Sequence, residues 1–235
     1  MSKNISVVMS VYAPTETKKF LKNAGYNVFD GTVLSGVDPR VAHHIDMQLV
    51  KCADNQFLCA PSVYNHYIDL FEKNGCNLST GDGEPNGEYP NDIGYNIAVT
   101  GKYAFHNFKY TDTAFLNESA YTRINVNQGY SKCNVSVVGK SAIITSDIGI
   151  AKACKNNKID VLLVREGYIK LDGYNHGFIG GCTGLIEKNI LAFVGDATTH
   201  PDYDSIKSFC LNHGVFTESL GKGDLMDVGT IISLG

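Results

Sequence analysis

Short apolar runs alternate with amphipathic segments along the chain, in an order that repeats. Five of the apolar runs end in a proline, aspartate or threonine. Such residues suit the start of a helix. Proline lacks the N–H group that would have no partner in the first turn, and aspartate or threonine side chains can accept hydrogen bonds from the free N–H groups of that turn. These five run ends are at residues 11–14, 58–61, 109–112, 144–147 and 193–196. The pattern therefore predicts five helices, each directly after a strand.

Three of the predicted helices have clear ends. They cover Thr15–Ala24, Val63–Asn74 and Pro201–His213, and a glycine follows each one, where it can adopt the left-handed conformation that ends a helix. Apolar positions in the last of them recur at spacings of three and four, which predicts one face packed on a sheet. The other two helices, Ala114–Ala120 and Ile148–Lys155, are shorter or richer in small residues.

Further strands flank these strand and helix pairs. Strands are expected before them at His44–Val50, Asp92–Ala98, Cys133–Val138 and Phe178–Ile186, and after them at Tyr26–Phe29, Arg123–Val126, Val161–Val164 and Val215–Ser219. The first unit lacks a preceding strand, and the C-terminal strand Asp227–Leu234 has no helix after it. We therefore expect the C-terminal strand to complete the first unit.

The repeating unit is thus strand, strand, helix, strand, in five copies at a period of about 40 residues, which is typical of propellers and other repeat architectures. A ring closed by the C-terminal strand would leave no unit with an unpaired inner edge. We predict an α/β fold, a five-bladed propeller forming a single domain over residues 1–235. The expected units are 226–235 with 5–30, 43–80, 91–128, 132–166 and 177–220. The alternative is an ordinary mixed α/β domain with coincidental spacing.

Composition narrows the class of function. With 43% hydrophobic and 19% charged residues, the chain has an ordinary globular balance. Its 20 basic and 24 acidic side chains give a net charge of −4, so there is no overall positive field and we expect no nucleic-acid partner. Serines interrupt the first apolar run, Ile5–Tyr12, which predicts neither a signal peptide nor a membrane span, and we expect no membrane partner.

The chain has seven cysteines, an odd number, and none lies in a C-x-x-C pair with metal spacing. We interpret them as reduced thiols of a cytoplasmic protein. Free cysteine commonly behaves as a small buried hydrophobe, so packing is the alternative role for each one.

Two short motifs contain residue types with catalytic chemistry: His44-Ile45-Asp46 and Gly180-Gly181-Cys182. Together with the five units, they resemble the pentein superfamily, the fold of guanidino-group modifying enzymes, and the chain resembles an uncharacterised clostridial-type family of that fold. The histidine motif is similar to the His-Leu-Asp stretch of arginine deiminases, and the likeness implies that His44 is a general acid and base and that Asp46 binds the guanidinium. The cysteine motif is similar to the glycine-rich strand that precedes the nucleophile of deiminases, which implies that Cys182 is the nucleophile.

Other residues are candidates for substrate binding. Asp92 and Asp227 each begin an expected inner strand and could add a second carboxylate, which a planar cation requires. Arg40, shortly before the histidines, is the best of the three arginines for a substrate carboxylate. His176 and the glycines Gly180 and Gly181 lie in a glycine-rich segment where backbone can approach a ligand. No cofactor and no metal site are expected.

Each candidate also has a structural alternative. His44 could be a hydrogen-bonded interior residue with His43 facing solvent, Asp46 could accept a backbone N–H, and Cys182 could be a packing residue. Asp92 and Asp227 could each form a turn. We therefore weigh two functions: a cysteine hydrolase acting on a small guanidine or amidine, and a non-catalytic binding protein of the same fold, as in the ribosome-binding branch. A small molecule is the expected ligand, and nothing in the sequence predicts the oligomeric state.

Overall fold

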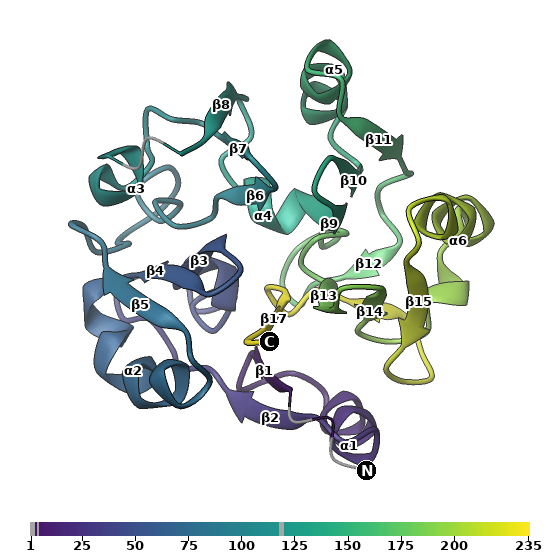
Figure 1. The fold of residues 1–235 in the computed structure, drawn as a ribbon, viewed down its shortest axis with the longest axis horizontal. Helices are drawn as coiled ribbons and strands as arrows, with labels where there is room; N and C mark the ends of the chain where they lie inside the picture. Colours follow the sequence, from purple (N-terminus) through teal and green to yellow (C-terminus); the bar gives the residue numbers. More distant parts are fainter. Residues whose placement is uncertain (1–2, 4, 118–119) are drawn as a thin grey trace.

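The computed structural model describes residue 3, residues 5–117 and residues 120–235. Five three-stranded sheets surround a common centre, each with its inner strand nearest the centre and a helix on its outer side (Figure 1). This architecture is a mixed α/β fold of the propeller-like kind that the repeat predicts.

Each sheet combines an inner, a middle and an outer strand with one helix. The first has β17 (Ile231–Ser233), β1 (Ser6–Met9) and β2 (Asn27–Asp30) with α1 (Thr15–Asn23), and the second has β3 (Leu49–Ala53), β4 (Gln56–Cys59) and β5 (Asn77–Thr80) with α2 (Tyr64–Lys73). The third has β6 (Ala98–Thr100), β7 (Tyr103–His106) and β8 (Thr122–Asn125) with α3 (Thr113–Asn117). The fourth has β9 (Val135–Gly139), β10 (Ala142–Thr145) and β11 (Asp160–Leu163) with α5 (Ile148–Asn156), and the fifth has β13 (Thr183–Glu187), β14 (Ile190–Phe193) and β15 (Phe216–Ser219) with α6 (Tyr203–Asn212).

The strands of every sheet pair in the same way. The middle strand runs antiparallel to the inner strand and parallel to the outer one, and the helix makes the crossover between the two parallel strands. β17 pairs with β1, with Val7 opposite Ser233, so the C-terminal strand completes the first unit as predicted. The five sheets remain separate rather than forming one closed sheet, so closure of a five-bladed ring stays a prediction.

The helix ends follow the glycine pattern. Gly25, Gly75 and Gly214 have φ angles of 93°, 69° and 72°, the left-handed region that an L side chain rarely adopts, and this confirms their predicted place after three helices. The predicted helix Ala114–Ala120 corresponds to α3, and its residues 118 and 119 lie outside the described residues.

The inner strands begin later than the sequence predicts. A 3₁₀ helix, η1 (Ile45–Met47), precedes β3, and a short helical turn, α4 (Ser131–Asn134), precedes β9. The predicted strands His44–Val50 and Cys133–Val138 are therefore wrong in their first residues. In a strand, successive side chains point to opposite faces, whereas a helical turn lets near neighbours face one centre. Residues next to each other in these two turns can therefore point toward the same place.

Beyond these units, β12 (Ile169–Lys170) pairs with β16 (Leu225–Met226) in a two-stranded parallel sheet that the sequence pattern did not predict. Two further 3₁₀ helices, η2 (Pro61–Val63) and η3 (Ala197–Thr199), lead toward α2 and α6. The core lies between each helix and its sheet, where side chains such as Tyr67 and Phe71 of α2 are completely buried. Among the described residues, none of the helices has the length and apolar character that a membrane crossing requires.

Candidate active site

The segments that lead into the inner strands meet at the centre of the molecule. Backbone hydrogen bonds join them: Asp46 N to Gly229 O at 3.2 Å, Gly181 N to Cys133 O at 2.9 Å, and Thr230 N to Gly181 O at 2.7 Å. Four segments that are distant in sequence, from the first, second, fourth and fifth units, are thereby fixed against one another.

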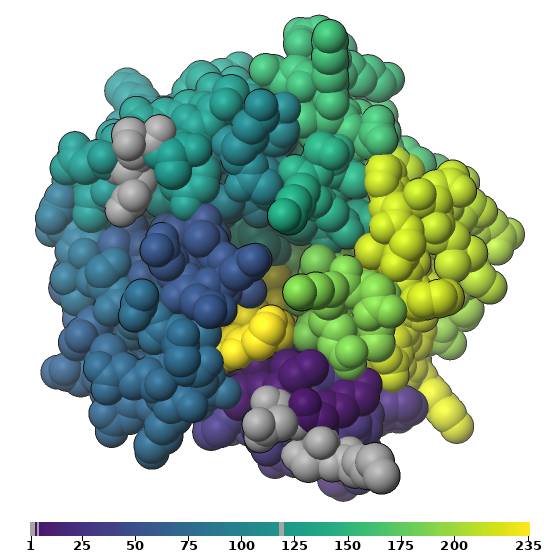
Figure 2. Space-filling model, in the orientation of Figure 1, coloured from purple at the N-terminus to yellow at the C-terminus, as the bar shows by residue number. Residues whose placement is uncertain are grey.

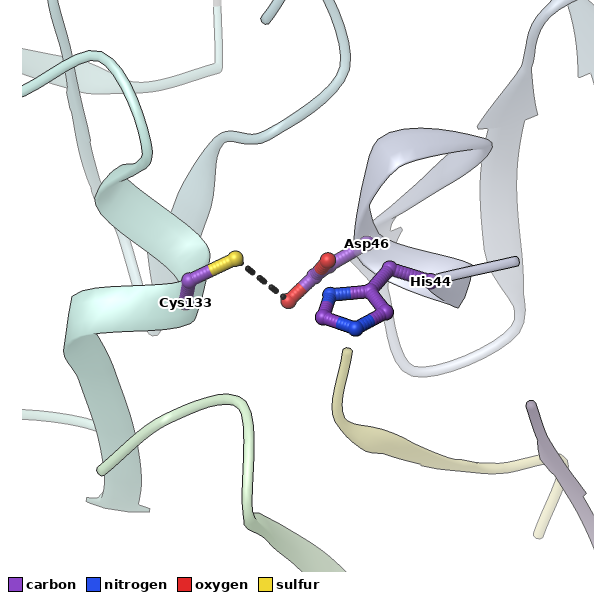
Figure 3. Close-up of side chains that lie close together, drawn as sticks. All are labelled: His44, Asp46 and Cys133. Atoms are coloured by element: carbon purple, nitrogen blue, oxygen red, sulfur yellow. Dashed lines mark hydrogen bonds between the residues drawn. The ribbon is translucent and has the colours of Figure 1, made fainter. Parts of the chain in front are cut away.

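His44, Asp46 and Cys133 form a buried cluster at this meeting point (Figure 3). The Cys133 thiol donates a hydrogen bond to Asp46 Oδ2 at 3.1 Å, and one polar atom from each of the three side chains lies within 4.8 Å of the others. η1 and the residue before it supply His44 and Asp46, and α4 supplies Cys133 from the opposite side. A thiol, an imidazole and a carboxylate are therefore within reach of one small ligand.

Two polar atoms of this cluster have no hydrogen-bond partner among the described residues. They are Nε2 of His44 and Oδ1 of Asp46, and both are buried. Buried polar atoms in folded proteins are nearly always paired, so an unpaired one requires an explanation. Two such atoms beside one thiol indicate a place where a ligand completes the hydrogen bonding.

Asp227 is a further carboxyl group next to His44. One oxygen, Oδ1, is 3.8 Å from His44 Nδ1 and accepts from Gly229 N at 3.0 Å, while Oδ2 accepts from Phe178 N at 2.9 Å. Burial raises the pKa of Asp227 to about 6, and the two backbone hydrogen bonds partly oppose that rise. Asp227 is thus a fixed neighbour of the imidazole.

Lys132, next to Cys133, brings an amine into the same centre. Its Nζ donates to Thr230 Oγ1 at 2.8 Å and lies 3.4 Å from the carbonyl oxygens of Val135 and Gly180. Part of the side chain remains accessible along a central channel, but the ammonium end is enclosed by protein, and this burial lowers its pKa. Asp46 and Cys133 favour the charged form of Lys132.

Electrostatics keep the resting thiol protonated. Burial raises the pKa of Cys133 well above its usual value, and the carboxylates of Asp46 and Asp227 raise it further. Burial also raises the pKa of Asp46 and lowers that of His44. Each group therefore favours its uncharged form, and a cationic ligand would change that balance.

The predicted nucleophile, Cys182, lies near this centre, where Asp227 and Lys132 act on its thiol electrostatically, but its hydrogen bond is not to His44 or Asp46. Cys182 is completely buried, its Sγ lies 3.4 Å from Ile179 O, and it packs in an apolar cluster with side chains such as Phe193 and Leu225. Burial raises the pKa of the Cys182 thiol well above its usual value. The contact with Asp46 belongs to Cys133, so the geometry favours the packing role that was the alternative for Cys182.

The other predicted binding residues have structural partners. Asp92 Oδ2 accepts from Tyr130 OH at 2.6 Å, while its buried Oδ1 has no hydrogen-bond partner among the described residues. Arg40 pairs with Asp38 and donates to Gly173 O at 2.8 Å. The described contacts join neither Asp92 nor Arg40 to the buried cluster.

The glycine-rich segment serves the site through close packing. A Cβ at Gly181 would collide with the Asp227 carboxylate, and one at Gly180 would collide with backbone carbonyls of the fourth unit. His176 lies at the start of this segment, with Nδ1 3.1 Å from Gly177 O. Because Gly180 and Gly181 have no side chains, Asp227 and α4 can approach the centre closely.

Sequence reasoning did not identify Cys133 and Lys132 as site residues. A signal was present, because Cys133 stands at the start of its predicted inner strand, as Asp92 and Asp227 do in theirs. The first position of each predicted inner strand was therefore a better indicator of site residues than the glycines around Cys182.

A channel leads from the cluster to the surface. It is a cavity of about 1180 Å³, lined by all five inner strands, and it reaches Asp46, Lys132 and Thr230 at its inner end. The space-filling view shows the hollow at the centre of the molecule (Figure 2).

A metal ion is a second kind of ligand that the cluster could hold. Imidazole, thiolate and carboxylate are all ligands of Zn²⁺, and three protein ligands are usual in catalytic zinc sites. The buried ammonium of Lys132, which interacts electrostatically with both Asp46 and Cys133, opposes a dication at this point.

Comparison with known proteins places the chain in a family. The model of a family of unknown function, DUF6873, matches residues 8–232, and the chain belongs to that family. None of the curated proteins compared with the sequence matches it. The narrower resemblance to a clostridial-type family stays a prediction.

Several solved structures share the fold. An amidinotransferase of the saxitoxin biosynthetic pathway from Microseira wollei has 9% identity and a TM-score of 0.55, with 95% of this chain and 94% of that one covered. DDAH from Pseudomonas aeruginosa has 7% identity and a TM-score of 0.50, with 91% of each chain covered. An arginine dihydrolase of the cyanobacterial ornithine–ammonia cycle has 12% identity and a TM-score of 0.50, with 92% of this chain but 36% of that one covered. At these identities the likeness shows the fold alone.

Proposed function

We propose that this member of the DUF6873 family is a cysteine hydrolase acting on a small guanidine or amidine compound, with Cys133 as its nucleophile in place of the predicted Cys182. One observation carries the proposal. The Cys133 thiol donates a hydrogen bond to Asp46 at 3.1 Å beside His44, and Asp46 Oδ1 and His44 Nε2 are buried without a hydrogen-bond partner among the described residues. The fold shared with guanidino-group modifying enzymes supports it.

Asp46 binds the cation in this proposal. Its unpaired Oδ1 can accept an N–H of a planar guanidinium or amidinium, and a charge-assisted hydrogen bond of this kind is stronger than a neutral one. Because Oδ2 already contacts Cys133 Sγ, a cation held by Asp46 lies beside the sulfur. The electrophilic carbon is then positioned for attack.

The bound cation also activates the thiol. The positive charge offsets the effect of Asp46, so the pKa of Cys133 falls when the ligand binds, and the thiol proton passes to the neighbouring imidazole of His44. The thiolate attacks the central carbon and forms a C–S bond. The imidazolium returns the proton to the departing nitrogen as the C–N bond breaks.

Water completes the reaction. The first step leaves on Cys133 an amidino group from a guanidine or an imidoyl group from an amidine, and ammonia or an amine departs. His44, again neutral, takes a proton from water as its oxygen adds to the carbon. The C–S bond then breaks, and the imidazolium returns the proton to the Cys133 sulfur. The water oxygen ends in a urea or amide product. The Asp227 carboxylate, 3.8 Å from His44 Nδ1, stabilises the protonated form of the ring by its charge.

Alkylation with 2-chloroacetamidine tests the assignment. This amidine forms a thioether with a thiolate and releases chloride, and peptide mass spectrometry locates the label. We expect the label on Cys133 at pH 7.5, at least tenfold faster than with neutral 2-chloroacetamide, because Asp46 binds the cationic reagent. Asp46→Asn should reduce that preference to less than twofold.

Two cysteine variants serve as matched controls. Cys133→Ala should lose the rapid label, and Cys182→Ala should keep it at the cost of about 1 kcal/mol of stability, since it removes one buried sulfur. A label on Cys182, or equal rates with both reagents in the unmodified protein, would contradict the proposal. A Cys133 that reacts with neither reagent would favour the alternative, a non-catalytic binding protein.

A further inference from the structure

A side-chain amide from the third unit lies against the sulfur of Cys133. Asn96 stands two residues before β6 and is completely buried. Its Nδ2 donates a hydrogen bond to Cys133 Sγ at 3.2 Å and lies 3.4 Å from Met47 Sδ in η1. Asn96 therefore brings the third unit into the centre, where segments of the other four units meet.

Backbone groups that can only donate fix the orientation of this amide. The N–H groups of Lys132 and Cys133 donate to Asn96 Oδ1 at 2.8 and 3.2 Å. A reversed amide would place its NH2 group against these two donors, and neither could accept a hydrogen bond from it. The amide oxygen therefore faces the backbone of α4, and the NH2 group faces the sulfur.

A donor that points at the sulfur favours the thiolate over the thiol. A thiol is a weak acceptor, whereas hydrogen bonds to an ionised group are roughly twice as strong as neutral ones. Burial and the carboxylates of Asp46 and Asp227 raise the pKa of Cys133, and the hydrogen bond from Asn96 opposes that rise. The other ionisable groups near the sulfur are His44, Lys132 and Tyr130.

We propose that Asn96 is a catalytic residue, which stabilises the thiolate of Cys133 through its Nδ2 hydrogen bond both when the sulfur attacks and when it leaves. This inference rests on the proposed function. When the thiol proton passes to His44, the sulfur no longer has a proton to donate to Asp46, but the N–H of Asn96 still points at it.

The same hydrogen bond serves the second step. As the C–S bond breaks, its electron pair returns to the sulfur, and a negative charge develops there. The N–H of Asn96 stabilises this charge until the imidazolium returns the proton. One fixed donor thus lowers the free energy of the thiolate on both sides of the covalent intermediate.

The dependence of labelling on pH tests the inference. Asn96→Leu keeps a similar side-chain shape and removes the N–H donor. With 2-chloroacetamidine at pH 7.5, we expect it to slow labelling of Cys133 at least tenfold, because the pH profile of the rate moves up by about one unit. At pH values above both midpoints, the rates of the two proteins should agree within threefold. A purely structural role would lower the rate at every pH and leave the midpoint in place.

Asn134→Leu is the matched control. Asn134 is also buried, and its Nδ2 donates to Tyr130 O at 3.0 Å, a contact within the α4 region. This change removes a buried amide that holds α4 but does not bond to the sulfur, so labelling should stay within threefold of the unmodified protein. Equal slowing in the two variants would show that Asn96 only anchors α4, and would overturn the inference.

Nuclear magnetic resonance of the unmodified protein covers the case in which Asn96→Leu does not fold. The side-chain N–H signals of Asn96 are followed as pH is raised, in the presence of acetamidine, with Cys133→Ser as the reference. They should move as the thiol ionises and stay in place in Cys133→Ser. Signals that do not move in the unmodified protein would contradict a hydrogen bond to the thiolate.

The outcomes separate this inference from the function beneath it. If Cys133 takes the label selectively but Asn96→Leu follows the same pH profile, the proposed function stands and the role of Asn96 does not. If the unmodified protein shows no selective label on Cys133, the proposed function fails and this inference fails with it.

Discussion

At the scale of single residues, the site depends on groups that the protein keeps uncharged until a ligand arrives. Cys133 donates to Asp46, burial lowers the pKa of His44, and burial raises the pKa of Asp46. A cationic ligand supplies the missing charge next to Asp46 and lowers the pKa of the thiol. Reactivity is therefore confined to the occupied site.

Asp227 should make stability depend on pH. Its pKa rises from 3.8 to about 6 on folding, so between these values the folded protein binds more protons than the unfolded chain. The free energy of unfolding then decreases as pH rises from 4 to above 6, by about 3 kcal/mol for this group. Asp227→Asn should remove that part of the decrease, measured by urea unfolding at pH 4, 5, 6 and 7. If the free energy of unfolding depends on pH in the same way in both proteins, the pKa of Asp227 is not raised by folding.

At the scale of elements, the turns that lead into the inner strands carry the chemistry. η1 presents His44 and Asp46, α4 presents Lys132 and Cys133, and the turn before β17 presents Asp227. Short helical turns allow near neighbours in sequence to face the centre together, which a strand does not. The strands behind them fix their positions.

Gly229 tests this arrangement. It has a φ of 72°, and a Cβ there would collide with His44, whereas Gly214 has the same φ with open space around it. Both changes to alanine strain the backbone by about 1 kcal/mol. Only Gly229→Ala should also displace His44 and slow labelling by 2-chloroacetamidine more than tenfold. Equal labelling rates in the two variants would show that the position of His44 does not depend on this contact.

At the scale of the whole molecule, the last strand belongs to the first sheet. β17 pairs with β1 and follows directly after Thr230, and Ile231, Ile232 and Leu234 are buried. The two chain ends therefore meet in one sheet, and that sheet supports part of the site.

A chain that lacks residues 231–235 should lose cooperative unfolding. The deletion leaves the edge of β1 unpaired and exposes apolar residues such as Val7 to water. Circular dichroism during heating measures the transition, and a chain that lacks only Gly235, which is exposed, is the control. If the shorter chain melts within a few degrees of the control, β17 is dispensable for folding.

Sequence by itself determined the repeating unit, the places of the helices and the pairing of the chain ends. These follow from local rules: apolar periodicity, residues suited to the first helical turn, and glycines with left-handed φ at helix ends. It also identified the segment that contains His44 and Asp46, because the motif is local.

Only the tertiary structure decided which cysteine meets them. Cys133 and Cys182 both stand near the start of an inner strand, and their surroundings in sequence favoured Cys182. The turn in α4 directs Cys133 toward Asp46, whereas Cys182 packs into the apolar cluster with Phe193. The direction of a side chain depends on the backbone turn before the strand, and contacts among four distant segments fix that turn.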